Sequence, residues 1–399
     1  MSSLKDFLNR WRKSRSTAPA SPQPAENLRQ AQQTEDWDRW NEVQTKRESQ
    51  KSVRELHRDA YTAYRQGQRE LAASLFGEAA ELARQQGDPA AQAENLHWKG
   101  DTLWQDDHLE AALHCLLLAD NLNALDPADR FRNLLDIVAV GNGLPLPLPQ
   151  LEDLFAKLEP YKGSQQLGGS KSMVLSNEGL LLYQRGKHGE ALARSQEAFA
   201  SRVSRRPFYH DMAYFNDLVD SYRLTGQYAE ARAILRQWKA QASYDYATEK
   251  SRILMTEAKL LYTEGHIQAA WDTMQQAYAE ERYIQRAGKH YRTLEWMIRI
   301  GSELGHFEQL RPLIRRMLHF RHAESRHARY GCHISLARYC CHVCIRGGLS
   351  PKDTARMHRH ARFWLRQADT TARHIDRLLE CDWRTKEVQE LLDLYNQSL

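Results

Sequence analysis

The sequence has few β-branched residues, few cysteines and no long hydrophobic run. Leu, Ala, Arg, Glu and Gln dominate instead, and this composition favours helix along nearly the whole chain. No apolar stretch approaches the roughly 20 residues that a helix needs to span a bilayer, and no secretory signal is visible. We therefore expect an all-α fold with no transmembrane segment.

The six cysteines are placed unevenly, because five of them lie between residues 332 and 381. Adjacent Cys340 and Cys341 do not suit structural disulfides, so a reducing, cytoplasmic location is the simpler expectation. The stretch GCHISLARYCCHVCIRGG also contains His333 and His342, and cysteine with histidine can bind zinc. Since Cys340 falls on a small-residue position of the repeat described below, we predict that it packs in the core. A metal or redox site at residues 332–344 is the alternative.

The sequence also lacks the motifs of common enzyme classes. It contains no GxxxxGK[ST] loop, no GxGxxG turn at a strand–helix junction, no HExxH helix and no GxSxG elbow. With 42% hydrophobic and 27% charged residues, the chain can still build a folded core. We predict a non-enzymatic protein with no catalytic residue, no cofactor and no metal.

A loop residue recurs along the chain with a period near 40. This marker is Gly67, Asp107, Gly186, Gly226, Gly265 and Gly305, and its separations are 40, 79, 40, 39 and 40. The value of 79 spans two units. Apolar residues recur at helical spacing before the marker, as in Phe215, Leu218 and Tyr222, and again after it. An alanine follows the marker by five residues at positions 72, 112, 191, 231 and 270. The pattern predicts helix hairpins that bury their apolar faces by stacking.

This pattern resembles the tetratricopeptide repeat (TPR), which has a small residue seven positions before the loop glycine and alanine five positions after it. The small residue here is Ala60, Gly100, Gly179, Ala258 and Cys340. The period exceeds the usual 34 residues of the family, so the chain is most similar to the longer-helix variety found in bacterial regulators and peptide sensors. The resemblance covers about residues 50–350. It implies a right-handed α-solenoid of about seven to eight antiparallel hairpins that serves as a protein-interaction scaffold.

The sequence divides into four parts. Residues 1–25 combine a short basic amphipathic segment with a Pro/Ser linker, and residues 4–15 of that segment could contact a membrane surface. Residues 26–52 are expected to form a capping helix with Trp37 and Trp40. Residues 53–350 form the repeat array, and residues 351–399 form basic C-terminal helices that cap it.

One unit of the array is irregular. The stretch VGNGLPLPLPQ has prolines at positions 145, 147 and 149, which forbid a continuous helix there. It lies where the degenerate marker of the third unit is expected. We therefore predict a longer loop between the two helices of this unit, with the second helix beginning near Pro149.

The first helices of TPR hairpins line a concave groove, and the register carries the groove positions of the family onto this chain. Twelve positions into each unit stand Tyr64, Trp104, Tyr183, Arg223 and Tyr262. Two positions in stand Arg54, Arg252 and Arg292, and five positions in stand His57, His97 and Asn216. Aromatic and arginine side chains suit a peptide with acidic and apolar side chains. Packing between helices is the alternative role for some of the aromatics.

Positive charge is concentrated near the C-terminus. The segment from Arg311 to Arg377 has 15 arginines and lysines but four acids, a local charge of +11 in a chain of +5. The basic patch that we select consists of Arg315, Arg316, Arg356, Arg359, Arg362 and Arg366. It predicts contact with an acidic protein segment, which eight histidines between residues 319 and 374 would strengthen in mild acid. A nucleic-acid-associated regulator that uses this face is the alternative, although aromatics for base stacking are few there.

Overall fold

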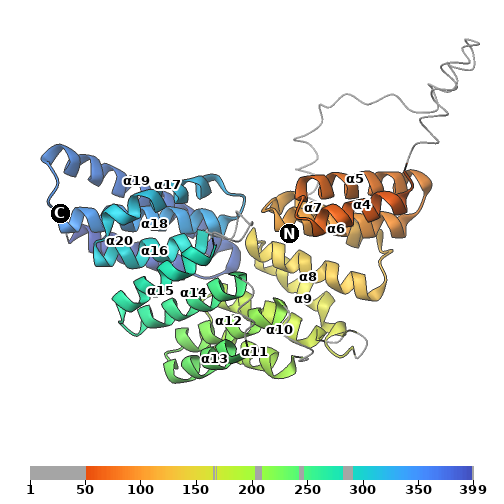
Figure 1. Ribbon diagram of the computed structural model, residues 1–399, viewed down its shortest axis with the longest axis horizontal. Helices are drawn as coiled ribbons and strands as arrows, with labels where there is room; N and C mark the ends of the chain where they lie inside the picture. Colours follow the sequence, from red (N-terminus) through yellow and green to blue (C-terminus); the bar gives the residue numbers. More distant parts are fainter. Residues whose placement is uncertain are drawn as a thin grey trace, which may run out of the picture.

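The computed structural model describes residues 51–164, 167, 169–202, 209–241, 247–281 and 291–397. Within these ranges the chain contains seventeen α-helices, α4 to α20, and no strand (Figure 1). The all-α prediction is therefore confirmed. The amphipathic segment, the Pro/Ser linker and the Trp37–Trp40 capping helix lie outside the described residues.

The helices form eight successive hairpins followed by one last helix. The first four hairpins are α4 (Val53–Arg65) with α5 (Arg69–Gln86), α6 (Pro89–Gln105) with α7 (Leu109–Leu122), α8 (Pro127–Gly143) with α9 (Leu148–Leu158), and α10 (Ser170–Gln184) with α11 (His188–Ser201). The next four are α12 (Tyr209–Leu224) with α13 (Tyr228–Gln241), α14 (Ala247–Thr263) with α15 (Ile267–Glu281), α16 (Tyr291–Leu304) with α17 (Phe307–Met317), and α18 (Arg326–Arg346) with α19 (Pro351–Leu379). The last helix is α20 (Trp383–Asn396). The structure thus confirms a helical-repeat solenoid with the hairpins that the TPR resemblance implies.

The marker residues form the turn inside each hairpin. Gly67, Gly186 and Gly226 have φ angles of 77°, 75° and 76°, and Asp107 adopts 62° at the equivalent place. Such left-handed backbone costs glycine little and lets the chain reverse immediately after a helix. The 40-residue period in the sequence is therefore the spacing of these turns.

The small residues that precede the markers lie where the two helices of a hairpin touch. Ala60 and Ala258 are fully buried, and Cys340 is 6% exposed. A Cβ atom at Gly100 would lie only 2.6 Å from the Cγ atom of Leu116 on the partner helix α7. A small side chain at this position is thus required by close helix packing, as the sequence predicts.

The proline-rich stretch is the loop between α8 and α9. Helix α8 ends at Gly143, and α9 begins at Leu148 with Pro147 as its N-cap residue. Leu144 and Leu146 are buried, so the loop packs in the core. The predicted break in the helix is confirmed, and the second helix begins one residue before Pro149.

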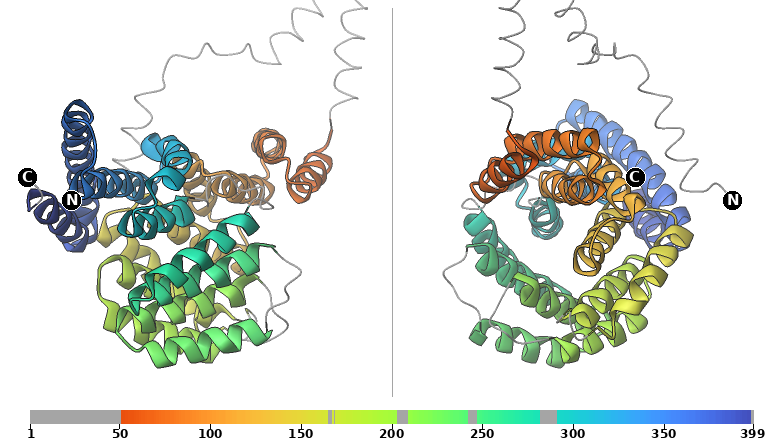
Figure 2. Two further views of the ribbon diagram at one scale, coloured as in Figure 1. Left: turned by 60° about the vertical axis from the view of Figure 1, so that its left-hand side comes forward. Right: turned by 90° about the vertical axis from the view of Figure 1, so that its right-hand side faces the viewer.

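The hairpins wind into a superhelix whose C-terminal helices pack back against its first half. In the right-hand view of Figure 2 they pass around a ring from the orange N-terminal helices through yellow and green to the blue C-terminal helices. Figure 1 shows that these blue helices are displaced to one side of α4 to α7 rather than beside them. One hydrophobic cluster joins residues of α7–α10 to residues of α18–α20. Polar contacts add to it, because Arg326 of α18 donates to the carbonyl of Leu144 at 2.9 Å and Trp383 of α20 donates to that of Gln184 at 2.7 Å.

The first helices of the hairpins form the inner layer of this ring. Each first helix from α4 to α18 packs on the first helix of the next hairpin, whereas successive second helices contact one another far less in the described part of the chain. Tyr183 of α10 also lies within electrostatic reach of Arg292 and Glu295 of α16, across the ring. The side chains of the first helices therefore decide what the inner face can bind.

Candidate ligand-binding face

The inner face is built from hydrogen bonds between neighbouring first helices. Side chains about one repeat apart are paired in each of the following contacts. They are His57 with Asn95 at 3.0 Å, Tyr64 with Asp101 at 2.8 Å, His97 with Asn133 at 3.2 Å, Ser176 with Asp217 at 2.9 Å, and Asn216 with Thr256 at 2.9 Å. Since each bond joins two hairpins, the ladder fixes the spacing of the repeats while it makes their inner surface polar.

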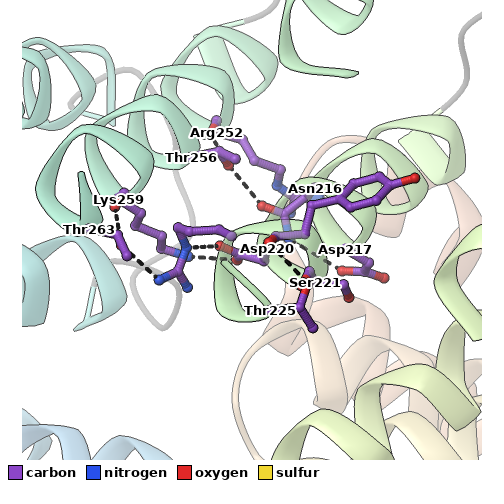
Figure 3. A network of polar contacts seen from close by, with 11 residues as sticks. Asn216, Asp217, Asp220, Ser221, Thr225, Arg252, Thr256, Lys259 and Thr263 are labelled. Atoms are coloured by element: carbon purple, nitrogen blue, oxygen red, sulfur yellow. Dashed lines mark hydrogen bonds and ion pairs between the residues drawn. The ribbon is translucent and has the colours of Figure 1, made fainter. Parts of the chain in front are cut away.

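An ion cluster lies in the middle of this ladder (Figure 3). The Asp220 carboxylate of α12 accepts hydrogen bonds from Arg223 at 3.0 Å and from Lys259 of α14 at 3.1 Å. Arg223 also donates to Thr263 at 3.2 Å. Burial raises the pKa of Asp220, but Lys259 and Arg223 outweigh burial and hold that pKa at about 2. One carboxylate therefore serves two buried cations.

A second ion cluster brings α16, α18 and α20 together. Glu387 of α20 accepts hydrogen bonds from the Tyr330 hydroxyl at 2.6 Å, from Arg338 at 3.0 Å and from Arg299. Burial raises the pKa of Glu387, but Arg299 and Arg338 outweigh it and hold the value at about 2. Again a single carboxylate is shared by two arginines.

Trp296 of α16 links the two ion clusters. Its ring lies 4.9 Å from the Arg299 guanidinium, and 5.8 Å from both Arg223 and the Lys259 ammonium. Tyr262 of α14 meets the same ring edge-on, with centroids 5.6 Å apart. Cations favour the face of an aromatic ring, so this partly buried tryptophan gathers positive charge from three helices.

The structure brings four of the predicted groove residues to this region. Arg223 and Tyr262 contact Trp296, while Tyr183 and Arg292 lie within electrostatic reach of each other. Burial, followed by the hydrogen bond to Glu303, raises the pKa of Tyr262 to about 12. Burial also raises the pKa of Tyr183. Both phenols therefore stay neutral; the hydroxyl of Tyr262 donates to Glu303, and its ring lies against Trp296.

The other predicted groove residues lie elsewhere on the first helices. Tyr64, His57, His97 and Asn216 take part in the ladder described above, and Trp104 packs partly buried against the main core. Arg54 is exposed at the start of α4, and Arg252 of α14 is partly buried. Their part in ligand binding stays a prediction.

Sequence reasoning missed a charged residue that stands six positions before four of the six markers. These residues are Asp101, Asp220, Lys259 and Arg299. A charged residue repeated at this period inside apolar helices was a visible signal, because such a residue must find a partner when buried. Glu387 gave no comparable signal, since α20 stands outside the repeat.

The basic patch is exposed but is divided between two helices. Arg315 and Arg316 lie on α17, whereas Arg356, Arg359, Arg362 and Arg366 are exposed on α19. The first ten residues of α19 include no buried side chain. A surface pocket of about 580 Å³ at this end of α19 is lined by Leu349, Pro351, Thr354, Ala355, His358, Arg359 and Arg362.

The histidines near this patch add less charge than their number suggested. Burial lowers the pKa of His327, His333, His342 and His374, so these four imidazoles resist protonation in mild acid. Half of the predicted eight histidines are therefore poor sources of positive charge at pH 6. The expected strengthening of binding in mild acid is correspondingly smaller.

The cysteine-rich stretch belongs to the core. Cys332 and Cys341 are fully buried in α18, and Cys340 packs in the main hydrophobic cluster as predicted. Burial raises the pKa of the Cys341 thiol to about 12, which makes its thiolate scarce at neutral pH. In the described ranges, no three His, Cys, Asp or Glu side chains are grouped so that they could hold a metal ion. No described helix is long and apolar enough to cross a bilayer.

No protein-family model matches this sequence, and no curated protein is similar to it. The crystal structure of the P58(IPK) TPR domain is similar to 86% of this chain over 98% of its own length, with 14% identity and a TM-score of 0.24. A circular tandem repeat protein with a novel repeat topology covers 94% of both chains, with 12% identity and a TM-score of 0.18. Such low TM-scores establish neither a family nor a function, so the repeat architecture rests on the hairpins themselves.

Proposed function

We propose that the protein is a non-enzymatic scaffold that captures an acidic segment of a protein partner on its inner face, in an adaptor or regulatory role. The observation that carries the proposal is the surplus of cations around Trp296. The five cations are Arg223, Lys259, Arg292, Arg299 and Arg338, and the four nearby carboxyl groups are Asp220, Glu295, Glu303 and Glu387. Burial raises the pKa of Glu295, which favours its neutral form and increases the surplus.

An uncompensated positive charge inside a protein is costly because burial removes the water that would solvate it. Burial lowers the pKa of Lys259, and Asp220 offsets this only in part. A bound carboxylate would reduce the cost for several cations at once. The same charge would therefore both attract an acidic segment and hold it.

Aromatic side chains supply the apolar part of the proposed site. Tyr183, Tyr262 and Trp296 are only partly buried, so each keeps some surface on the inner face. Large aromatic rings that lose little rotamer freedom are the usual anchors of protein interfaces. A segment that alternates acidic and apolar side chains would use both kinds of contact. A cytoplasmic location of the protein would suit its six cysteines, none of which forms a disulfide.

The experiment is affinity capture followed by mass spectrometry, with wild type, Tyr183→Ala/Tyr262→Ala and a matched control. Tyr228→Ala is the control because Tyr228 begins the second helix α13, in the outer layer, and belongs neither to the inner face nor to the basic patch. We expect the double variant to weaken capture by at least about 2 kcal/mol, or about 30-fold, while circular dichroism shows unchanged helix. Equal capture by both variants would show that the inner face is not the binding site.

A second candidate function is supported by the exposed arginines of α19. Arg356, Arg359 and Arg362 follow one another at helical spacing, and the first two lie on the part of the helix that has no buried side chain. The guanidinium group of arginine can donate two parallel hydrogen bonds to one phosphate group, so a nucleic-acid-associated regulator would use this face. Binding to random DNA or RNA that falls steeply with salt, and that survives Tyr183→Ala/Tyr262→Ala, would favour this function over the first.

A further inference from the structure

The arginines that hold Glu387 keep buried donors that no other protein group accepts. In the described part of the chain, Nε of Arg299, Nη1 of Arg338 and Oγ of Ser302 are buried and have no hydrogen-bond partner. Arg338 is 9% exposed and Ser302 is fully buried. Leaving a buried polar group without a partner is unfavourable, and more so when the group is charged. These donors therefore call for a strong acceptor.

Arg299 and Arg338 lie near a more open arginine, Arg292, and Ser302 follows Arg299 by about one helical turn on α16. Arg292 precedes Arg299 by seven residues on α16, which places both on one face of the helix, two turns apart. Glu295 lies within electrostatic reach of Arg292, Arg299 and Arg338, so all three guanidinium groups surround one region. The side chain of Arg292 is exposed. It thus forms the entrance to the buried donors.

The number and directions of the donors distinguish among anions. Glu387 already provides a carboxylate: its Oε1 accepts from Arg299 and Arg338, and its Oε2 accepts from the Tyr330 hydroxyl. The remaining buried donors on α16 and α18 are not used by Glu387. A tetrahedral phosphoryl group has three oxygens and a charge near −2, so it can accept from several arginines at once.

We propose that Arg292, Arg299, Arg338 and Ser302 form a binding site for a phosphoryl group, with Trp296 beside it to contact the group that carries the phosphate. This site, named here the arginine site, lies on the inner face, and the inference rests on the proposed function of that face. The phosphoryl group belongs either to a modified residue of the captured segment or to a small phosphate ester. Both sources offer the same chemistry to the four side chains.

The direct test is isothermal titration of the full chain with inorganic pyrophosphate, O-phospho-L-tyrosine and malonate at equal ionic strength. Malonate carries two negative charges on planar carboxylates and so tests charge without tetrahedral geometry. We expect saturable binding of the phosphoryl compounds at least tenfold tighter than that of malonate. Arg292→Gln should weaken it at least tenfold, and it should fold normally because Arg292 is exposed. Arg377→Gln is the control, since it removes the same charge from an exposed position on α19.

The two sources are separated by treating the partner with a phosphatase before capture. Loss of capture would assign the site to a modified protein segment, and unchanged capture together with pyrophosphate binding would assign it to a small phosphate ester. Equal affinity for malonate, or unchanged affinity in Arg292→Gln and in Arg299→Gln, would overturn the inference. The proposed function would survive that result if the inner-face tyrosines were still needed for capture. Conversely, phosphoryl binding without any captured partner would support the arginine site alone.

Discussion

Substitution of glycine by alanine at one position of the repeat should stabilise one hairpin and destabilise another. Gly100 and Gly179 both stand seven residues before the turn, where Ala60 and Ala258 stand in other units. A Cβ atom at Gly179 would have its nearest neighbour at 3.4 Å, the Oγ atom of Ser195, which is ordinary contact. A Cβ atom at Gly100 would lie 2.6 and 2.7 Å from two carbons of Leu116.

The magnitude follows from two competing effects. Replacing glycine by alanine inside a helix stabilises it by about 0.5–1 kcal/mol, and nothing opposes this at Gly179. At Gly100 the added methyl group would force the fully buried side chain of Leu116 to move. The methyl group would also lie only 3.2 Å from the carbonyl oxygen of Ala112. Overpacking of this kind costs about 1–3 kcal/mol. We therefore expect Gly179→Ala to be more stable than Gly100→Ala by about 1–3 kcal/mol.

Hydrogen exchange measured by mass spectrometry suits this test, because hairpins of a solenoid can unfold separately and a global midpoint would average over them. Protection should fall in α6 and α7 of Gly100→Ala and should be kept or rise in α10 and α11 of Gly179→Ala. The loss of protection caused by Gly100→Ala should be smaller when it is measured in a Leu116→Ala background, because the shorter side chain makes room for the new methyl group. Equal protection in the two single variants would refute the packing argument.

Three further outcomes are expected. Arg326→Ala removes a link between α18 and the end of α8, so small-angle scattering should show a larger radius of gyration with unchanged helix content; an unaltered radius would mean that the apolar cluster closes the ring alone. The folded-state pKa of Asp220 is about 2, below the ordinary 3.8, so its contribution to stability is full above about pH 4 and is lost as the pH falls toward 2; thermal melts of Asp220→Asn should lack this part of the acid dependence. Reversal of Arg356, Arg359 and Arg362 to Glu should weaken partner binding, and the wild-type affinity should fall steeply with added salt. If the affinity changes neither with salt nor with the reversal, α19 only caps the solenoid.

The hairpins could be predicted from the sequence because their signals are local. A glycine such as Gly226 marks a turn whatever surrounds it, and Leu235 and Trp238 mark the buried face of α13 by spacing alone. The repeat then multiplied each signal several times. The loop at Pro147 was equally readable, since proline forbids helix for reasons internal to the backbone.

The ion clusters were harder to predict because their partners come from distant parts of the chain. The register placed Arg223 in the groove, but it did not reveal that Asp220 and Thr263 already use its donors. It also gave no place to Glu387, which reaches Arg299 from a helix outside the repeat. The contact of Glu387 depends on the ring closing, and no periodicity of one hairpin contains that information.

Ring closure and the inner face are therefore physically linked. Glu387 is positioned by α20, and α20 is held at its start by the bond from Trp383 to the carbonyl of Gln184 at the end of α10. A second link is the ion pair of Arg384 with Asp376 at 3.1 Å, in which both side chains are almost fully buried. If the ring opened, Glu387 would move with α20 and would leave Arg299 and Arg338 without their shared carboxylate. The charge that the inner face presents to a ligand is thus set by contacts of the last helix with the middle of the solenoid, and binding and closure must influence each other.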